Sequence, residues 1–207
     1  MVSRNSHSQQ VRLFRNEWLE RLTIISPAGF AVVWSISLPM IAWVGWGTAT
    51  VLPALGLVAL GLAVWTLFEY CMHRYLFHWE PNVRLLDRFV YLMHGNHHAA
   101  PNDPLRNLMP PIVSFPIGGA VWLVLVAIAG PVGTWIFLGF MSGYVIYDMT
   151  HYACHQWAMR GPLAFALKRH HMRHHHVGQD GNFAITALFW DRVFGTSITS
   201  LKAREEA

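Results

Sequence analysis

The chain has 207 residues, of which 54% are hydrophobic and only 13% charged, and its formal net charge is +4 with 13 histidines counted as neutral. The high hydrophobicity excludes an intrinsically disordered chain, and two cysteines are too few for a disulfide-rich scaffold. A small positive charge without a dense basic run argues against a nucleic-acid binder. The composition indicates a membrane protein with an unusual number of histidines.

Residues 1–26 form an N-terminal segment ahead of the first long apolar run. Between Gln9 and Ile25, apolar side chains recur at helical spacing with arginine and glutamate between them. The pattern predicts an amphipathic helix. It fits a helix on the cytoplasmic membrane surface and a helix packed on the rest of the protein about equally well.

Four apolar runs follow, at about residues 27–46, 48–68, 112–129 and 132–147. A helix needs about 20 residues to cross the hydrocarbon core of a bilayer, so the last two runs are slightly short. The joints within the first pair and within the second pair are short and almost without polar residues. We therefore expect an all-α integral membrane protein with four transmembrane helices in two hairpins.

The basic residues indicate the orientation of these helices. All 15 lysines and arginines precede the first run, lie between the second and third, or follow the fourth. With four spans these regions share one side, and the positive-inside rule makes that side cytoplasmic. We expect a multi-pass protein with both termini in the cytoplasm. Residues 27–207 would form a single membrane domain, with residues 69–110 and 148–207 as a cytoplasmic helical cap.

Twelve of the 13 histidines fall in four clusters within this cap, and only His7 is isolated, which is typical of a solvated side chain. The clusters are His73 and His78; His94, His97 and His98; His151 and His155; and His170, His171, His174, His175 and His176.

The spacing of the histidines indicates metal binding. Residues at i, i+3 and i+4 share one face of a helix, and two clusters contain this pattern. His73 and His78, at i and i+5, require a helix end or a local distortion. Imidazole suits iron, zinc, copper or nickel, and this many histidines exceeds what one zinc requires. We therefore predict a site for two metal ions. His170 and His176 fall outside the H-x-x-H-H pattern, so we expect them to support the ligands rather than to bind metal.

Four acidic residues lie near the clusters: Glu69, Asp103, Asp148 and Asp191. They could orient the imidazole N–H groups, or cap helices and face solvent. Asp148 is the best candidate for orienting a ligand because it precedes His151 by three residues. Aromatic residues near the clusters could pack in the core or line a substrate site: Phe68, Tyr70, Phe77, Tyr91 and Tyr147.

Five strings give the chain a family resemblance: EYCMHRYLFH (69–78), HGNHHAAPND (94–103), YDMTHYACH (147–155), LKRHHMRHHH (167–176) and FWDRVFGT (189–196). With them the chain resembles the fatty acid hydroxylase/sterol desaturase superfamily of integral membrane di-iron enzymes, and fatty acid 2-hydroxylases most closely. The resemblance implies two iron ions, replaceable by zinc in isolated protein, and O2 as a cosubstrate. It implies an O2-dependent monooxygenase that hydroxylates C2 of a fatty acid or acyl lipid, with no catalytic residue beyond the metal site. The implied metal ligands are His73, His78, His94, His97, His98, His151, His155, His171, His174 and His175.

The chain departs from this superfamily in two respects. Many members have a further histidine where this chain has Gln156. Eukaryotic 2-hydroxylases often carry an N-terminal cytochrome b5 domain, for which the segment before the first run is too short. We therefore expect a separate electron donor, such as cytochrome b5 or ferredoxin. A carotenoid or sterol hydroxylase or desaturase of the same superfamily is an alternative. A non-catalytic metal-binding membrane protein is another, although a transporter would need ionisable residues within its spans.

Overall fold

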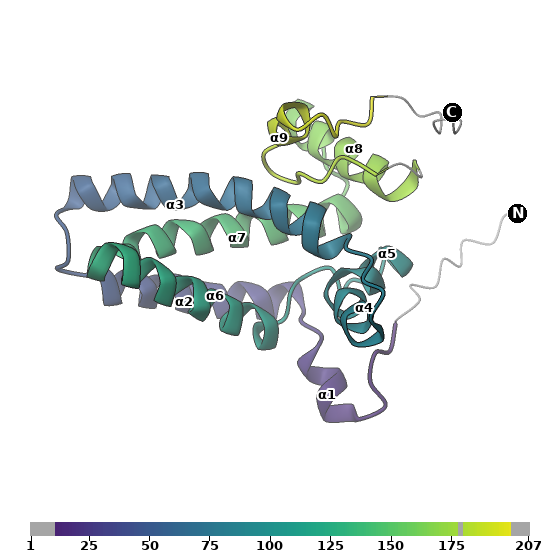
Figure 1. The fold of residues 1–207 in the computed structure, drawn as a ribbon, viewed down its shortest axis with the longest axis horizontal. Coiled ribbons are helices and arrows are strands. Elements are labelled where there is room, and N and C mark those ends of the chain that lie inside the picture. Colours follow the sequence, from purple (N-terminus) through teal and green to yellow (C-terminus); the bar gives the residue numbers. More distant parts are fainter. Residues whose placement is uncertain (1–10, 178–179, 200–207) are drawn as a thin grey trace, which may run out of the picture.

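The computed structural model describes residues 11–177 and 180–199, and all the regular structure in this part of the chain is helical. Four long helices run side by side as an elongated trunk, and shorter helices gather at one end of it (Figure 1). The long helices are α2 (Pro27–Gly45), α3 (Val51–Cys71), α6 (Pro111–Ala129) and α7 (Gly133–Gln156). The predicted all-α fold is thus confirmed.

The shorter elements form a cap at that end of the trunk. On one side lie α8 (Pro162–His176) and α9 (Phe189–Val193), and on the other lie α1 (Glu17–Leu22), α4 (Arg84–Val90) and α5 (Asn96–Ala99) (Figure 1). Two π-helical segments continue neighbouring helices: η1 (Met72–Phe77) extends α3, and η2 (Tyr91–Gly95) joins α4 to α5. A short 3₁₀ turn, η3 (Gly130–Val132), joins α6 to α7.

Three segments in the described part of the chain are long and apolar enough to cross a membrane: Pro27–Gly45, Val51–Phe77 and Pro111–Gln156. The third contains both α6 and α7, which fold back on each other at η3. Trp122 Nε1 on α6 donates to Thr134 Oγ1 on α7 at 3.1 Å, and Gly118 faces the side chain of Met141. These pairings run in opposite directions along the two helices, so α6 and α7 are an antiparallel hairpin.

Helix α7 is the centre of the trunk, and it packs on α3 at backbone contact. A Cβ added to Gly139 would lie 2.0 Å from the carbonyl oxygen of Val58, and one added to Gly61 would lie 2.0 Å from that of Ile136. No side chain fits at either position, so only glycine permits this approach. Small residues commonly bring membrane helices together in this way.

Two of the long helices extend beyond the predicted apolar runs. Helix α7 continues past residue 147 to Gln156, and α3 continues through η1 to Phe77. The predicted ends followed the loss of apolar residues, whereas the helices continue because their polar ends are buried inside the cap. The distortion expected around His73 and His78 is confirmed, because η1 is π-helical. An i to i+5 bonding pattern brings residues five apart onto one side.

The helix predicted over residues 9–25 is wrong for most of its described length, because only Glu17–Leu22 is helical. Asn16 Oδ1 caps α1 by accepting from the amides of Trp18 and Leu19. Before Asn16, the amides of Leu13 and Phe14 donate to the carboxylate of Glu20 instead of to helical carbonyls. Side-chain acceptors therefore replace the helical bonds of this stretch.

Candidate metal centre

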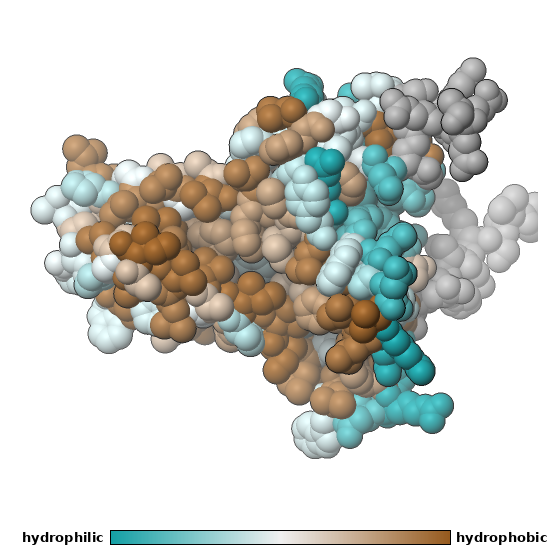
Figure 2. Space-filling view, in the orientation of Figure 1, coloured by the Kyte–Doolittle hydropathy of each residue, from teal (hydrophilic) through white to brown (hydrophobic). Residues whose placement is uncertain are grey.

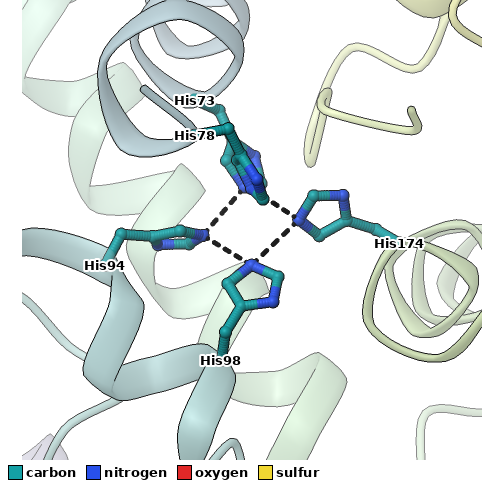
Figure 3. Close-up of side chains that lie close together, drawn as sticks. All are labelled: His73, His78, His94, His98 and His174. Atoms are coloured by element: carbon teal, nitrogen blue, oxygen red, sulfur yellow. Dashed lines mark hydrogen bonds between the residues drawn. The ribbon is translucent and has the colours of Figure 1, made fainter. Parts of the chain in front are cut away.

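The structure brings the ten predicted ligands together in two groups of five imidazoles. The first group is His73, His78, His94, His98 and His174, and the second is His97, His151, His155, His171 and His175. Within each group the facing nitrogens all lie within 4.8 Å of one another. Figure 3 shows the first group converging on one point from η1, η2, α5 and α8.

A simple rule divides the histidines between the groups. Residues four apart on a helix join the same group, as His94 and His98 do, whereas His97 points into the other group. The same holds on α8, where His171 and His175 are together and His174 is not. At about 100° per residue, positions i+3 and i+4 share a helix face with position i but flank it on its two different sides. One H-x-x-H-H motif can therefore serve two ions.

The spacing of the Nε2 atoms fits the coordination shell of a metal. Neighbouring Nε2 atoms of the first group are 2.9–3.1 Å apart, and those of the second group are 2.7–3.1 Å apart. Two nitrogens bound to an ion at about 2.1 Å and at right angles would lie about 3.0 Å apart. Five such ligands leave room for a further ligand on each ion.

The hydrogen-bond partners of Nδ1 show which ring nitrogen carries the lone pair in three of the imidazoles. Nδ1 of His73 lies 2.6 Å from the carbonyl oxygen of Phe183, and Nδ1 of His174 lies 2.8 Å from that of Gly181. Nδ1 of His151 similarly lies 3.1 Å from the carbonyl oxygen of Asn107. A carbonyl only accepts, so each Nδ1 carries the proton and each Nε2 presents its lone pair to the group. Converging lone pairs repel one another unless a cation lies between them, so the donor set fits a metal ion.

Burial keeps the imidazoles of the two groups neutral. Burial, followed by the neighbouring imidazoles, lowers the pKa of His94, His97 and His171 well below the usual value. Burial likewise lowers the pKa of His98 to about 4 and that of His174 to about 3. Desolvation disfavours the imidazolium. At neutral pH these rings are neutral, with one nitrogen free of a proton, which is the form that binds metal.

Two buried acids fix the loop that orients the first group. The carboxylate of Glu69 accepts from the amide of Thr186 at 2.8 Å and from its hydroxyl at 2.7 Å. Asp191 accepts from the amides of Phe183 and Ala184, each at 2.9 Å. Loop 181–187 is therefore held from α3 and α9, and its carbonyls at positions 181 and 183 face His174 and His73.

The predicted supporting residues occupy different places. His170 Nε2 lies 2.9 Å from Asp191 Oδ2, so it reaches the ligands through that loop, whereas His176 is exposed. Asp148 Oδ2 accepts from the amide of Met109 at 2.8 Å and the hydroxyl of Tyr144 at 3.1 Å, so it fixes the chain beside Asn107. Asp103 accepts from the amide of Val11.

Other supporting residues were not predicted from the sequence. The carbonyls of Asn107, Gly181 and Phe183 have no signature in the sequence because every residue has a carbonyl. Asn182 has a detectable signal, since asparagine following glycine is typical of a tight turn. Its φ is 54°, and its side chain links the carbonyl of His170 to the amide of Ile198. Gln156, the departure from the family pattern, donates to the carbonyl of Asn102 and belongs to neither group.

A cavity of about 370 Å³ lies beside both histidine groups. His94 of the first group and His97 and His151 of the second form part of its wall, and apolar side chains form most of the rest. Phe77 and Tyr147 also line it, whereas Phe68 lines a smaller space in the trunk. A hydrophobic chain in this cavity would lie next to histidines of both groups.

Comparison with known proteins identifies relatives. The fatty acid hydroxylase family model matches residues 58–196. A dihydroceramide fatty acyl 2-hydroxylase of Arabidopsis thaliana is 35% identical over 203 residues, covering 94% of this chain and 83% of the relative. A fatty acid 2-hydroxylase of Homo sapiens is 31% identical over 91% of this chain and 57% of its own length.

A solved structure is also similar. It is described as full-length scs7p with only the hydroxylase domain visible, and it superposes with a TM-score of 0.84 at 32% identity, covering 94% of this chain and 74% of that one. The family model covers well over half of the chain, and the long matches to named hydroxylases agree with it. This chain belongs to the fatty acid hydroxylase family.

Proposed function

We propose that this protein is a membrane-bound, O2-dependent di-iron enzyme that hydroxylates C2 of a fatty acyl chain, in a free fatty acid or in an acyl lipid such as a ceramide. The observation that carries the proposal is the pair of five-imidazole groups beside one apolar cavity. The names of the relatives support the acyl chain as substrate, since they are fatty acid and dihydroceramide 2-hydroxylases.

The ten histidines would hold two iron ions, one in each group, and zinc could take their place in isolated protein because imidazole binds both. When bound, the irons would supply the chemistry that activates O2 and oxidises an unactivated C–H bond. The residues of the chain do the rest. They orient the ligands through the carbonyls of Asn107, Gly181 and Phe183, and the apolar wall of the cavity keeps water from the acyl chain.

For the membrane topology, we propose that residues 27–207 form one domain in which α2, α3, α6 and α7 each cross the bilayer. All 15 basic residues lie before the first hairpin, between the two hairpins or after the second, and four crossings place these regions on one side of the membrane. By the positive-inside rule, both termini and the cap would then lie in the cytoplasm. The antiparallel pairing of α6 with α7 supports four crossings. A cytoplasmic cap would receive its electrons from a separate donor, such as cytochrome b5 or ferredoxin.

Lipid mass spectrometry of cells that express the protein tests this function. Wild type should add the mass of one oxygen to acyl lipids, with fragmentation placing the hydroxyl at C2. His174→Ala should abolish the product, because it removes a ligand of the first group, and the exposed His176→Ala should retain it. If wild type adds oxygen to no acyl lipid, the proposed function is wrong. Oxygen on a sterol or carotenoid instead would favour the alternative within the superfamily.

A further inference from the structure

The N-terminal arm, residues 11–25, lies across the outer side of the large cavity. Leu13, Phe14, Leu19 and Leu22 line the cavity from the arm, and His94, His97 and His151 of the two histidine groups also line it. The remaining wall comes from α4 and η2, with Phe89 and Leu92, and from the start of α6, with Ile112. The arm thus forms part of the wall of a cavity that also contains histidines of both groups.

Buried polar contacts fasten the arm. The guanidinium of Arg106 is ion-paired to Glu20 and donates to the carbonyl of Val11 and, at 3.2 Å, to Thr23 Oγ1. Asp103 accepts from the amide of Val11 at 3.0 Å. The side chains of Arg106 and Asp103 are only 3% and 2% exposed. The position of the arm is therefore fixed, although α1 contributes no fully buried side chain.

The rim of the cavity is apolar on its outer side as well. Five lining residues on α1, α4, η2 and α6 keep 39–51% of their surface exposed: Leu19, Leu22, Phe89, Leu92 and Ile112. On the same outer surface, Trp18 and Leu85 are each 76% exposed. Figure 2 shows hydrophobic surface continuing from the trunk over the region of α4 and towards α1. Exposed apolar surface of this extent marks a contact with lipid or with a partner.

Lipid is the occupant that the structure favours. The apolar surface of α1 and α4 continues that of the candidate spans, and exposed arginines flank it: Arg21 on α1 and Arg84 and Arg88 on α4. Exposed apolar side chains beside basic ones are typical of helices that lie at the headgroup boundary of a membrane. The rim of the cavity would then lie at the depth of the lipid chains.

We propose that the acyl substrate enters the cavity sideways from the membrane, between α1 and α4, and that the N-terminal arm is the wall that selects the length and position of its chain. This inference rests on the proposed function for the identity of the substrate. It assigns the arm a binding role, with Leu22 and Phe89 at the entrance.

Photocrosslinking of the purified, metal-loaded enzyme in vesicles tests the route. The probe is a long-chain dihydroceramide that carries a diazirine in the middle of its acyl chain. We expect crosslinks to peptides of the arm and of α4 and η2. Crosslinks confined to α8 and α9, or to the outer face of α2, would overturn the proposal even if the enzyme hydroxylates the probe. Crosslinks at the arm without hydroxylation would leave the route standing and reject the proposed function.

A matched pair of tryptophan variants tests the selection of the chain. Leu22→Trp fills the cavity from the arm, whereas Leu85→Trp adds the same group to the outer surface of α4. Leu22→Trp should shift the ratio of short to long hydroxylated chains by on the order of tenfold, which is the discrimination that a small change in an apolar pocket produces. Leu85→Trp should leave the ratio unchanged. If both variants bind two ions and show the wild-type ratio, the arm does not select the chain.

Discussion

His97 and His98 are neighbours in the sequence, yet their rings face different groups. His97 Nε2 lies 2.9 Å from His151 Nε2, whereas His98 Nε2 lies 2.9 Å from His94 Nε2. Their Nε2 atoms also approach different residues of α8, since that of His97 lies 3.0 Å from His175 Nε2 and that of His98 lies 3.1 Å from His174 Nε2. Adjacent residues of one short helix thus belong to two different groups.

This division predicts how many ions double variants retain. His94→Ala/His98→Ala removes two ligands from the first group only, so about one ion per chain should remain. His97→Ala/His98→Ala removes one ligand from each group, so both ions should be lost or much more weakly held. Elemental analysis of the purified variants measures the content, with the exposed His176→Ala as the control that keeps two. Equal content in the two double variants would contradict the division.

Asp191 is predicted to support the first group without touching a metal. Asp191→Asn replaces one acceptor oxygen with a donor, so one of the contacts to Phe183, Ala184 or His170 is lost. Because Phe183 orients His73, affinity for the ion of the first group should fall by roughly 10–100-fold. Competition with a chelator measures this affinity, and the exposed Asp87→Asn is the control. An equal loss from both groups would indicate general unfolding rather than positioning.

The sequence predicts the ten histidines of the two groups better than the residues that orient them. The ten histidines could be named from spacing and family resemblance because the imidazole itself is the signal. Asp148 illustrates the opposite case, since its position before His151 suggested a direct contact. In the structure it binds Met109 and Tyr144 instead, because the carbonyl of Asn107 already faces the ring of His151.

The packing of α7 on α3 leaves no room for a side chain at Gly139. Gly139→Ala would place a Cβ about 2.0 Å from the carbonyl oxygen of Val58, and no rotamer can relieve a clash with backbone. The helices must separate, so we expect the free energy of unfolding to fall by about 1–3 kcal/mol. His151 and His155 lie farther along α7, so metal should be held less tightly as well.

The control for this variant is Gly56→Ala on α3, where a Cβ would have nothing within 4 Å. Thermal unfolding in detergent should show a lower midpoint for Gly139→Ala and an unchanged or higher one for Gly56→Ala, because alanine favours helix. Equal midpoints for the two variants would show that α3 and α7 are not in backbone contact.

The elements themselves were predictable where hydropathy alone determines them. The apolar runs gave α2 and α6 to within a residue or two, because nothing polar interrupts them. The extensions of α3 and α7 and the short α1 were not predictable in this way. Their limits depend on tertiary partners, namely the cap that buries the histidines and the carboxylate of Glu20 that binds the amides of Leu13 and Phe14.

For the whole molecule, two metal ions bound to the two groups would link the cap to the trunk. The first group joins η1, at the end of α3, to α5 and α8, and the second joins α7 to the same two helices. Each group draws its histidines from segments that are far apart in the sequence, so ion binding is expected to stabilise the fold. Hydropathy and charge could predict that the cap lies at one end of the trunk. They could not predict which helices each ion connects.

Metal removal should destabilise the protein to an extent that depends on pH. A chelator should lower the unfolding temperature, because the metal-free fold must hold lone pairs facing one another. The metal-free protein should then lose stability as the pH falls. The pKa of His98 is lowered to about 4 and that of His174 to about 3, whereas in the unfolded chain each is near 6.5. Their contribution is therefore present above about pH 6.5 and is lost as the pH falls towards 4.

Lowering the pH from 7.5 to 5.5 should reduce the free energy of unfolding of the metal-free protein by about 1 kcal/mol for each such imidazole. The metal-loaded protein should change less over this range, since a bound ion resists protonation of its ligands until the acid displaces it. Thermal unfolding in detergent at the two pH values, with and without chelator, measures all four midpoints. If the chelator leaves the midpoint unchanged at both pH values, metal does not link the cap to the trunk.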